Sequence, residues 1–577
     1  MANIKKAERL SVEDVASVFT RLKGNIRASA KELGISRSSV RRKLEKTGLM
    51  KKPLVGGTKT GVVAEKRAIA PKGEVKRYIL TSAQNNTHVH AEFLANLEAL
   101  ADYYDAEIIV GTYTYNQNAY GPKSIKRGSE LTRDPKSFDK ELWYDPAIVK
   151  YIKDTRIELG KGLVWAGEYN ALPTNVNPLA GLESYTGRKS AIFPHAKLAM
   201  RSIATMQGEG VKLNYTTGTV TQRNYIQKRE GVIAEFHHIY GALLVEVNSE
   251  GQWWVRQLNQ DEGTGTLQDL TVLVKNGEIE ATDAAVEAIT YGDLHGTFAD
   301  PEIVKASLQM RNVLAPKFQF LHDVMEGASV QPHDRKNNAN HEKFYTWLRG
   351  YHKLEKELLD TAELLEQFHN DGTTTVVVDS NHDDAWIKRW LREYDYRKDP
   401  ANTEIFLDLQ AYFYSQIRNG MKGDTNWKPA CEKVEKSLGC EKGSISDKFP
   451  EPKMVRDINV LQYALKKFGG LKAPFKFLRA DESFLTCGRK IENGQHGHLG
   501  PSGKFGSPAE LSKMGRKANT AHTHSAGIFN GLYVAGTSSK LRWNYAVGPS
   551  SWTHSHIVTY PNGKRAIVTL FDGKWRA

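Results

Sequence analysis

The sequence is poor in cysteine and has no long apolar run. Its 577 residues include three cysteines (Cys431, Cys440 and Cys487) and no C-x-x-C pair. A disulfide framework and a cysteine-based zinc site are therefore not expected, and the composition fits a reducing cytoplasm. No uninterrupted apolar stretch approaches the roughly 18–20 residues that cross a bilayer, so we expect no membrane-spanning segment.

The N-terminus lacks the apolar core of a secretory signal, because Lys5, Lys6, Glu8 and Arg9 interrupt it. No internal repeat or low-complexity tract is present. A hydrophobic fraction of 40% with 11 Trp favours packed globular domains over disorder. A chain of this length should hold about two to four such domains. These features predict a cytoplasmic protein of several domains.

What the sequence has in excess is positive charge. Lys and Arg number 80 against 66 Asp and Glu, which gives a formal net charge of +14 and a pI near 9.2. A polyanionic partner is expected, and nucleic acid is the usual one. Charge alone is weak evidence for that partner, because many basic proteins bind no nucleic acid.

Part of the basic excess lies in the first fifty residues, where three short helices are predicted. Ser11 can cap the first helix, and residues 26–33 form the second. Gly34 then supplies a left-handed turn, and Ser36 caps a third helix that ends near Thr47. The pattern predicts a small all-α domain over residues 1–50.

This domain resembles helix-turn-helix domains of the Fis type, in particular over residues 30–37. The resemblance implies that the third helix lies in the major groove of DNA with its N-terminal residues at the base edges. The DNA-binding residues would be Arg37, Ser38, Ser39, Arg41 and Arg42. The alternative is a trihelical packing or oligomerisation module with a solvated basic face.

Residues 51–76 lose periodicity and gain Gly, Pro, Lys and Thr, which predicts a flexible basic linker. An α/β section follows over residues 77–284. Strands at 78–80 and 107–110 flank a helix at 91–104, which is the pattern of a βαβ unit. The role of this section stays open.

Two polar features of the α/β section carry no clear chemistry. Thr216, Thr217 and Thr219 are expected in a solvated polar loop. His88 and His90 form a His-x-His pair, but nothing downstream completes a set of metal ligands. A metal role for this pair is therefore not favoured.

Three clusters in the second half of the chain carry the residue types of a metal site. They are Asp293-x-His295, Asn381-His382-Asp383 and His522-x-His524, and each follows or adjoins a short apolar run that predicts a buried strand. Open α/β sheets bind ligands at the C-terminal ends of their strands. Mixed Asp, Asn and His ligation suits Mn, Fe or Zn and needs no thiolate.

In this order the clusters resemble the signature of the calcineurin-like metallophosphoesterases, which runs D-x-H, G-D-x-x-D, G-N-H-[DE], a lone His and G-H-x-H. The resemblance covers about residues 285–577. Ser380 and Ala521 stand where the family has Gly. The remaining positions of the first, third and last motifs match.

The second and fourth motifs match less closely. Asp323 is the best candidate for the second motif, with His322 in place of the family's Gly and Glu326 in place of its second acid. The lone His corresponds to His496, and His498 is a neighbour that could compete for the role.

The resemblance implies a metallophosphoesterase β-sandwich flanked by helices over residues 285–577. It also implies two divalent ions, with Mn favoured and Fe, Zn or Mg as alternatives. Asp293, His295 and His524 would hold one ion; Asn381, His496 and His522 would hold the other, with Asp323 bridging. His382 would stabilise or protonate the leaving oxygen, and Asp383 would orient it.

Helical insertions are expected between these motifs. The charged residues 341–369 fit a long helix or a helical hairpin with one buried face. The apolar positions of that face are Phe344, Leu348, Leu354, Leu358, Leu364 and Leu365. Residues 404–417 and 455–468 predict further helices. Such insertions could cap the site or build the contacts of a homo-oligomer.

The expected function is a two-metal phosphodiesterase acting as a DNA nuclease, nearest the repair nucleases of the SbcD type. A Fis-type domain joined to such a core also looks like an early protein of a tailed phage that degrades host DNA, which would place it in the host cytoplasm. One alternative is a protein or nucleotide phosphatase using the same site. Another is a DNA-binding regulator or DNA-transfer protein whose metal site is structural.

Overall fold

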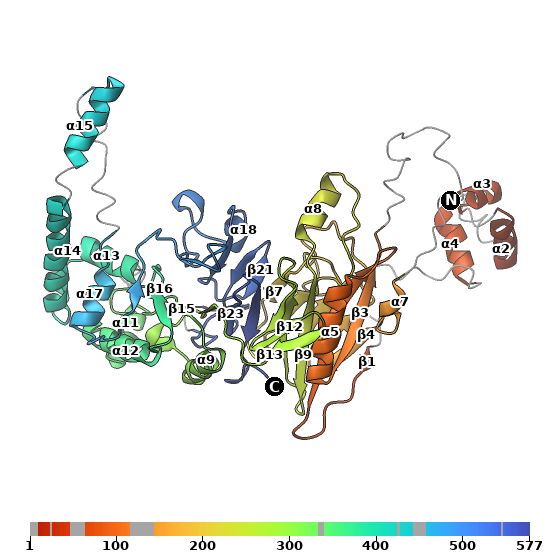
Figure 1. The fold of residues 1–577 in the computed structure, drawn as a ribbon, viewed down its shortest axis with the longest axis horizontal. Helices are drawn as coiled ribbons and strands as arrows, with labels where there is room; N and C mark the ends of the chain where they lie inside the picture. The colour runs from red at the N-terminus through yellow and green to blue at the C-terminus, as the bar shows by residue number, and fades with distance from the viewer. Residues whose placement is uncertain are drawn as a thin grey trace. The chain divides into compact units, whose positions relative to one another are not determined.

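The computed structural model shows a mixed α/β protein in two compact units, Met1–Val63 and Ala64–Ala577 (Figure 1). The residues that it describes are 10–22, 26–46, 64–115, 144–332, 340–423, 427–441, 457–543 and 546–577. Across these ranges, none of the helices combines the length and the apolar character that a bilayer crossing requires.

The first unit contains three helices at the predicted positions. They are α2 (Val12–Arg21), α3 (Ile26–Leu33) and α4 (Arg37–Lys46). Ser11 Oγ accepts a hydrogen bond from the Asp14 N–H at 2.9 Å, and Ser36 Oγ accepts one from the Ser39 N–H at 3.1 Å. Both predicted N-caps are therefore confirmed. Gly34 makes the turn with a φ of 64°. The buried core consists of Val15, Ala30, Ile35, Val40 and Leu44.

The structure describes only the second part of the predicted linker, residues 64–76. Residues 51–63 lie outside the described part of the chain. Residues 64–76 belong to the second unit, because β1 (Glu65–Lys66) pairs in parallel with β4 (Arg156–Gly160) and Ala70 is buried. The prediction of a flexible tether is therefore wrong for residues 64–76.

A six-stranded sheet in the second unit carries the first metal-ligand clusters. Its strands, in spatial order, are β17 (Lys476–Phe477), β16 (Thr374–Val377), β15 (Phe318–Leu321), β14 (Ala288–Thr290), β23 (Ser555–Thr559) and β24 (Arg565–Thr569). The first four strands run parallel, and β23 pairs with β14 in antiparallel orientation. The sheet therefore gathers several strand C-termini at one edge.

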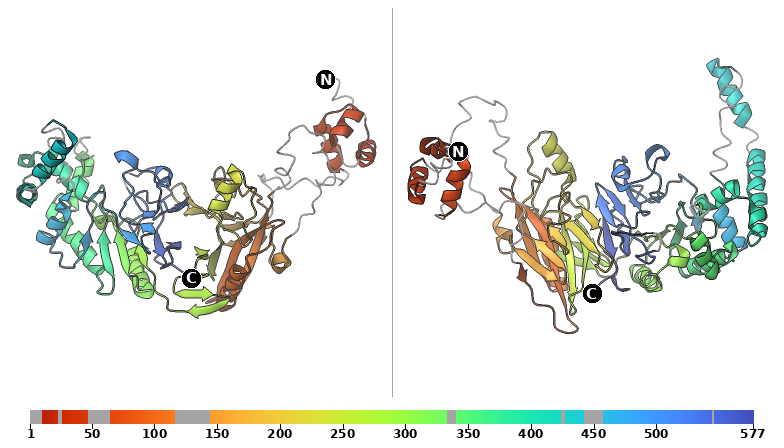
Figure 2. Two further views of the ribbon diagram at one scale, coloured as in Figure 1. Left: turned by 45° about the horizontal axis from the view of Figure 1, so that its top comes forward. Right: turned by 180° about the vertical axis from the view of Figure 1, so that it is seen from behind.

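Alternate residues of these strands face opposite layers. Ile289, Leu321 and Val377 pack against helices, while their neighbours Phe320 and Val376 point to a separate cluster on the other face. The helices on the first face are α9 (Pro301–Leu314), α12 (Leu354–Gln367), α13 (Asp384–Glu393), α14 (Thr403–Gly423) and α17 (Val460–Lys467). Figure 2 shows most of this helical layer gathered beside the sheet from two further directions.

An eleven-stranded sheet joins residues from both predicted α/β segments. Its strands, in order, are β1, β4, β5 (Leu163–Ala166), β6 (Ser190–Phe193), β8 (Lys212–Thr216), β7 (Met200–Ile203), β21 (Gly527–Phe529), β22 (Leu532–Val534), β20 (Lys517–Thr520), β19 (Ile491–Glu492) and β18 (Leu485–Thr486). The junction is the antiparallel pair β7 and β21, where Met200 lies opposite Ile528. The predicted boundary at residue 284 therefore falls inside one compact unit.

The predicted βαβ unit is present. Strand β2 (Val75–Gln84) and strand β3 (Ala106–Tyr113) pair in parallel, and α5 (Ala91–Tyr104) connects them. The same sheet continues through β9 (Gly241–Asn248) and β10 (Trp253–Asn259). A three-stranded sheet packs near α5 and consists of β11 (Leu267–Asp269), β12 (Val272–Lys275) and β13 (Glu278–Ala281).

The prediction of a solvated loop at Thr216, Thr217 and Thr219 is wrong, because all three side chains are fully buried. The Thr219 hydroxyl donates to Ser82 O at 2.8 Å, and the Thr216 hydroxyl donates to Lys197 O at 2.7 Å. A threonine in the interior satisfies its hydroxyl on neighbouring backbone, so a polar sequence here does not indicate solvent.

The charged segment 341–369 forms two helices, α11 (Asn340–Leu348) and α12, as the hairpin alternative predicts. Leu354, Leu358 and Leu365 of α12 are buried as expected. Phe344 and Leu348 of α11 are exposed, so the expected buried face is wrong in the first helix.

The predicted helices at 404–417 and 455–468 correspond to α14 and α17, and residues 455–456 lie outside the described residues. The remaining short elements are α7 (Pro146–Val149), α8 (Arg229–His237), η4 (Gly296–Phe298), η5 (Tyr396–Lys398), α15 (Trp427–Leu438), η6 (Pro501–Gly503) and α18 (Pro508–Leu511).

Candidate metal centre

Three neighbouring parallel strands each end in one of the predicted clusters. Thr290 of β14 lies opposite Phe320 of β15, which lies opposite Val376 of β16, so the three strand ends are level. The segments that follow carry Asp293 and His295, then Asp323, then Asn381 and His382. The fold therefore brings residues up to about ninety positions apart to one edge of the sheet.

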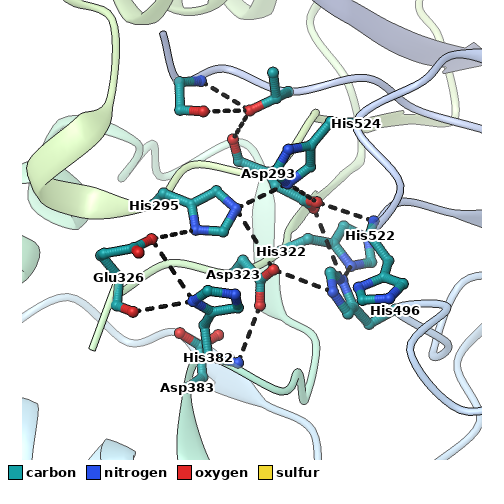
Figure 3. A network of polar contacts seen from close by, with 12 residues as sticks. Asp293, His295, His322, Asp323, Glu326, His382, Asp383, His496, His522 and His524 are labelled. Carbon is teal, nitrogen blue, oxygen red and sulfur yellow. Dashed lines mark hydrogen bonds and ion pairs between the residues drawn. The ribbon is translucent and has the colours of Figure 1, made fainter. Parts of the chain in front are cut away.

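The eleven-stranded sheet supplies the other histidines. His496 follows β19, and His522 and His524 follow β20, which runs parallel to β19. Figure 3 shows these side chains pointing toward Asp293 and Asp323. All seven predicted metal-site residues thus come from strand ends of two sheets.

Four of these residues have left-handed backbone conformations. The φ values are 50° at His295, 42° at Asp323, 71° at His522 and 57° at His524. This region costs a non-glycine residue about 1–3 kcal/mol, and such strain concentrates at functional sites. The turn before Asp293 is equally constrained, because a Cβ on Gly292 would lie 2.6 Å from the Thr537 nitrogen.

One group of potential ligand atoms lies around Asp293. Asp293, His295, Asp323 and His524 each offer a ligand atom, and these atoms lie within 4.8 Å of one another. His524 Nε2 is 3.1 Å from Asp293 Oδ2 and 2.9 Å from His295 Nε2. All four residues are buried.

A second group shares Asp323 with the first. It consists of Asp323, His496 and His522, again with ligand atoms within 4.8 Å of one another. His496 Nε2 is 3.2 Å from Asp323 Oδ2. The side chain of Asn381 is half-buried, and its Oδ1 atom is buried without a hydrogen-bond partner among the described residues. The shared position of Asp323 is the one predicted for a bridging ligand.

The electrostatics of the two groups favour a bound cation. Burial raises the pKa of Asp293 well above its usual value, and the Asp323 carboxylate raises it further. Burial alone would raise the pKa of Asp323 too, but His496, His382 and His295 outweigh it and hold that pKa well below its usual value. Burial also lowers the pKa of His524 to about 4. Burial likewise lowers the pKa of His295, His496 and His522, so these imidazoles are neutral near pH 7 and can offer lone pairs to a metal ion.

The donor set fits divalent metal ions. It combines carboxylates, imidazoles and one amide oxygen, which is the mixture that Mn, Fe and Zn accept. Asp293 Oδ1 is buried and accepts no hydrogen bond from a described residue. A buried acceptor left in this state costs about 1–3 kcal/mol, which a cation would offset.

His382 is held by Glu326 rather than by Asp383. The Nδ1 atom of His382 donates to the backbone oxygen of Glu326 at 3.0 Å and lies 3.6 Å from its carboxylate. Because a carbonyl only accepts, Nε2 is the ring nitrogen that keeps a lone pair in the neutral form. Burial lowers the pKa of His382.

Asp383 supports the loop beneath the site. Its two carboxylate oxygens accept hydrogen bonds from the backbone N–H groups of Met325, at 2.9 Å, and Val324, at 3.2 Å. The expectation that Asp383 orients His382 does not agree with these bonds. Asp383 instead positions the segment that directly follows Asp323.

Two residues near the centre, Glu326 and His322, have no assigned role in the sequence prediction, and His498 is its alternative to His496, the histidine that the second ligand group contains. Glu326 Oε2 lies 2.8 Å from His295 Nδ1, which is the arrangement that fixes a ligating histidine in one tautomer. His322 Nδ1 lies 3.3 Å from His496 Nδ1, behind the second group. The His498 ring lies 5.4 Å from that of His496. The spacing of Glu326 from Asp323, which matches the family's second acid, is the signal that could have identified its role.

The predicted DNA-binding residues lie on α4 in the first unit, with the polar groups at its start. Arg37 is exposed, and Ser39 is half-buried with its N–H bonded to Ser36. The side chains of Ser38, Arg41 and Arg42 lie outside the described part of the structure.

Over 514 residues the chain is 35% identical to Protein A1 of Escherichia phage T5, and the match covers 87% of this chain and 83% of that protein. The chain belongs to the Protein A1 family. No protein-family model and no solved structure matches it. The name Protein A1 states no activity, so the chemistry of this member of the family has to be argued from its residues.

Proposed function

We propose that this member of the Protein A1 family is a two-metal phosphodiesterase that cleaves DNA, with a calcineurin-like metallophosphoesterase core. The observation that carries the proposal is the pair of ligand groups that share Asp323. Parallel strand ends of one sheet supply Asp293, His295, Asp323 and Asn381, while a second sheet supplies the histidines. Two sheets that meet at such a centre are what the metallophosphoesterase sandwich requires.

The residues divide naturally between two ions. Asp293, His295 and His524 would hold one, and Asn381, His496 and His522 the other, with Asp323 between them. Two divalent ions in such a site supply positive charge to a phosphodiester and lower the pKa of water toward neutrality. The family resemblance favours manganese, and the mixture of carboxylates and neutral imidazoles also suits Fe or Zn.

His382 is the residue placed to assist the leaving group. Glu326 holds its Nδ1 atom, and the ring packs against Trp386 with 3.9 Å between centroids. A ring fixed on both sides presents Nε2 in one direction, which favours proton exchange at a single atom of the substrate. His382 lies outside the two groups that share Asp323, although it forms a third group of candidate ligands with His295 and Glu326.

DNA is the proposed polymer because of charge and domain organisation. The chain carries a net charge of +14, and its first unit matches the helix order of a helix-turn-helix. A DNA-binding unit outside the catalytic region raises the local concentration of DNA. The match with a phage T5 protein agrees with the phage setting of this proposal and carries no information on its activity.

A truncation tests the recruiting role of the first unit. Removing residues 1–63 should weaken DNA affinity and flatten its dependence on salt, because fewer Lys and Arg contacts release counterions. Hydrolysis of a small diester should stay near the full-length rate, since every proposed ligand lies in the second unit. Unchanged DNA affinity would make the first unit a protein-contact module.

The direct test of the function is a cleavage assay on plasmid and linear DNA with Mn, Mg or EDTA. We expect Mn-dependent cleavage that EDTA stops and that Asp293→Asn abolishes. A parallel assay with a phosphomonoester and a phosphodiester separates the nuclease from a phosphatase. Preference for the monoester would contradict the proposal, as would full activity in the Asp293→Asn protein.

A further inference from the structure

Helix α11 exposes an unusual set of large apolar side chains. Its four large apolar residues, Phe344, Tyr345, Trp347 and Leu348, are 60%, 47%, 56% and 61% exposed, and none of its nine residues is buried. The rings of Phe344 and Trp347 lie parallel, with an interplanar angle of 18° and centroids 5.8 Å apart. A contiguous apolar patch of this kind marks an interaction surface.

The exposed helix is continuous with the metal centre through a series of rings. Arg349 follows α11 and places its guanidinium over Tyr345, at 5.6 Å, and over Phe298, at 5.3 Å. Phe298 ends the η4 turn that begins directly after His295. Phe298 stacks on Trp543 at 5.2 Å, and Trp543 contacts the His295 ring edge-on at 4.6 Å. A path of rings therefore leads from a metal ligand to the surface.

The chemistry of this path fits a nucleic acid strand better than a protein. Three of the four large exposed side chains on α11 are aromatic, and residues 340–356 contain four Lys or Arg against two Glu. Aromatic rings interleaved with basic residues bind single-stranded nucleic acid, because bases stack on the rings while phosphates meet the cations. Arginine over an aromatic ring adds a cation–π contact in the same surface.

We propose that α11 is a stacking platform for unpaired bases, and that the substrate enters the metal centre as a single strand or as a frayed end. This inference rests on the proposed phosphodiesterase function and specifies its substrate. Bases would stack on Phe344 and Trp347, while Arg349 and Lys343 lie near the backbone phosphates. Paired bases present no free ring face, so duplex DNA without an unpaired segment should gain little from the platform.

The test uses the full-length protein in EDTA, so that binding is measured without cleavage. The probe is a fluorescent thymidine oligonucleotide of about 20 nucleotides, a length that exceeds the site of one binding module. The double variant Phe344→Ala/Trp347→Ala removes both stacked rings. Its matched control is Phe236→Ala, which removes a ring that is 82% exposed on α8 and contacts its neighbour His237. A blunt hairpin duplex serves as the second ligand.

We expect the double variant to bind the single strand on the order of tenfold or more weakly for each ring removed. The control variant should bind like the wild type, and duplex affinity should change little. Hydrolysis of bis(4-nitrophenyl) phosphate with Mn should be the same in all three proteins, because none of the proposed metal ligands is changed.

Wild-type affinity of the double variant for the single strand would overturn the platform. If the double variant also differs from the wild type in assembly mass, measured by light scattering, α11 is an interface between protein chains instead. Absence of diester hydrolysis by the wild type would overturn the proposed function. The two failures can be told apart, because binding is measured in EDTA and does not require hydrolysis.

Discussion

Of the four His-x-His motifs in the chain, His522-x-His524 and His88-x-His90 have surroundings that differ completely. His522 and His524 lie on left-handed backbone beside Asp293, with the His522 N–H donating to Asp293 Oδ2 at 2.9 Å. His88 is 74% exposed and pairs with Asp145 at 3.2 Å. His90 caps α5, its Nδ1 accepting the Phe93 N–H at 3.2 Å.

The difference lies in the partners rather than in the motif. At residues 522–524, two sheets converge and bring buried carboxylates to within hydrogen-bond distance of the imidazoles. At residues 88–90, the described partners are one helix start and the half-buried carboxylate of Asp145. A His-x-His motif therefore indicates a metal centre only when the fold supplies the remaining ligands.

The largest expected effect separates the two motifs directly. His524→Ala should reduce Mn-dependent DNA cleavage by more than about 100-fold, because even residues behind a metal ligand contribute about 10–100-fold. His88→Ala should change activity by no more than about twofold, as is usual for an exposed position. Rates of plasmid cleavage in Mn check both. Equal losses in the two variants would remove the distinction between the motifs.

A second test asks which histidines of the centre hold metal and which act on the substrate. His382→Ala should lower turnover by about tenfold or more, since a group that exchanges a proton with the reacting atoms contributes about 10²–10⁴. Metal content should match the wild type, in contrast to His524→Ala. Steady-state kinetics and elemental analysis on the same samples provide the measurement. Loss of an ion from the His382→Ala protein would make this residue a ligand.

A third test concerns His556, the buried histidine of a further His-x-His motif outside the ligand groups. Burial lowers the pKa of His556 to about 3; its Nδ1 accepts the Gly292 N–H at 3.1 Å. In the unfolded chain this pKa returns to about 6.5, so the unfolded state binds the proton more tightly. The contribution of His556 to the free energy of unfolding should therefore be fully present above pH 6.5 and be lost as the pH falls toward 3.

For a single such group the loss is about 1.4 kcal/mol per pH unit within that window. Urea unfolding in EDTA at several pH values measures the slope. His556→Gln should flatten it. Identical slopes for the wild type and His556→Gln would show that the lowered pKa of His556 is not the cause of the pH dependence.

The smallest expected effect concerns the cap formed by His90. His90→Ala should lower the free energy of unfolding by about 1 kcal/mol, because the Phe93 N–H loses its acceptor. His90→Asn should restore most of this stability, and neither variant should change metal content. Thermal unfolding combined with elemental analysis checks the prediction. A loss of metal in His90→Ala would give this motif a role in metal binding.

The sequence predicts local structure well where the causes are local. The caps at Ser11 and Ser36, the turn at Gly34 and the bounds of α5 all follow from neighbouring residues. The metal-ligand residues can be found because their motifs follow apolar strands. Their convergence depends on sheet pairing, which the sequence does not encode locally.

The predictions that fail depend on long-range packing. Phe344 and Leu348 have the helical spacing of a buried face, but only α12 has a helical layer to pack against. Asp383 follows His382 directly, yet its carboxylate reaches the backbone at 324–325 while Glu326 meets the imidazole. Thr216 and Thr219 are polar residues whose partners lie on distant backbone.

The most direct test of a two-ion centre is the number of Mn ions bound per chain in the wild type and in Asp323→Asn. Elemental analysis after equilibration with Mn and desalting gives this number. Because Asp323 belongs to both ligand groups, we predict two ions in the wild type and the loss of at least one in the variant. One ion or none in the wild type, or two ions retained in Asp323→Asn, would contradict the shared centre.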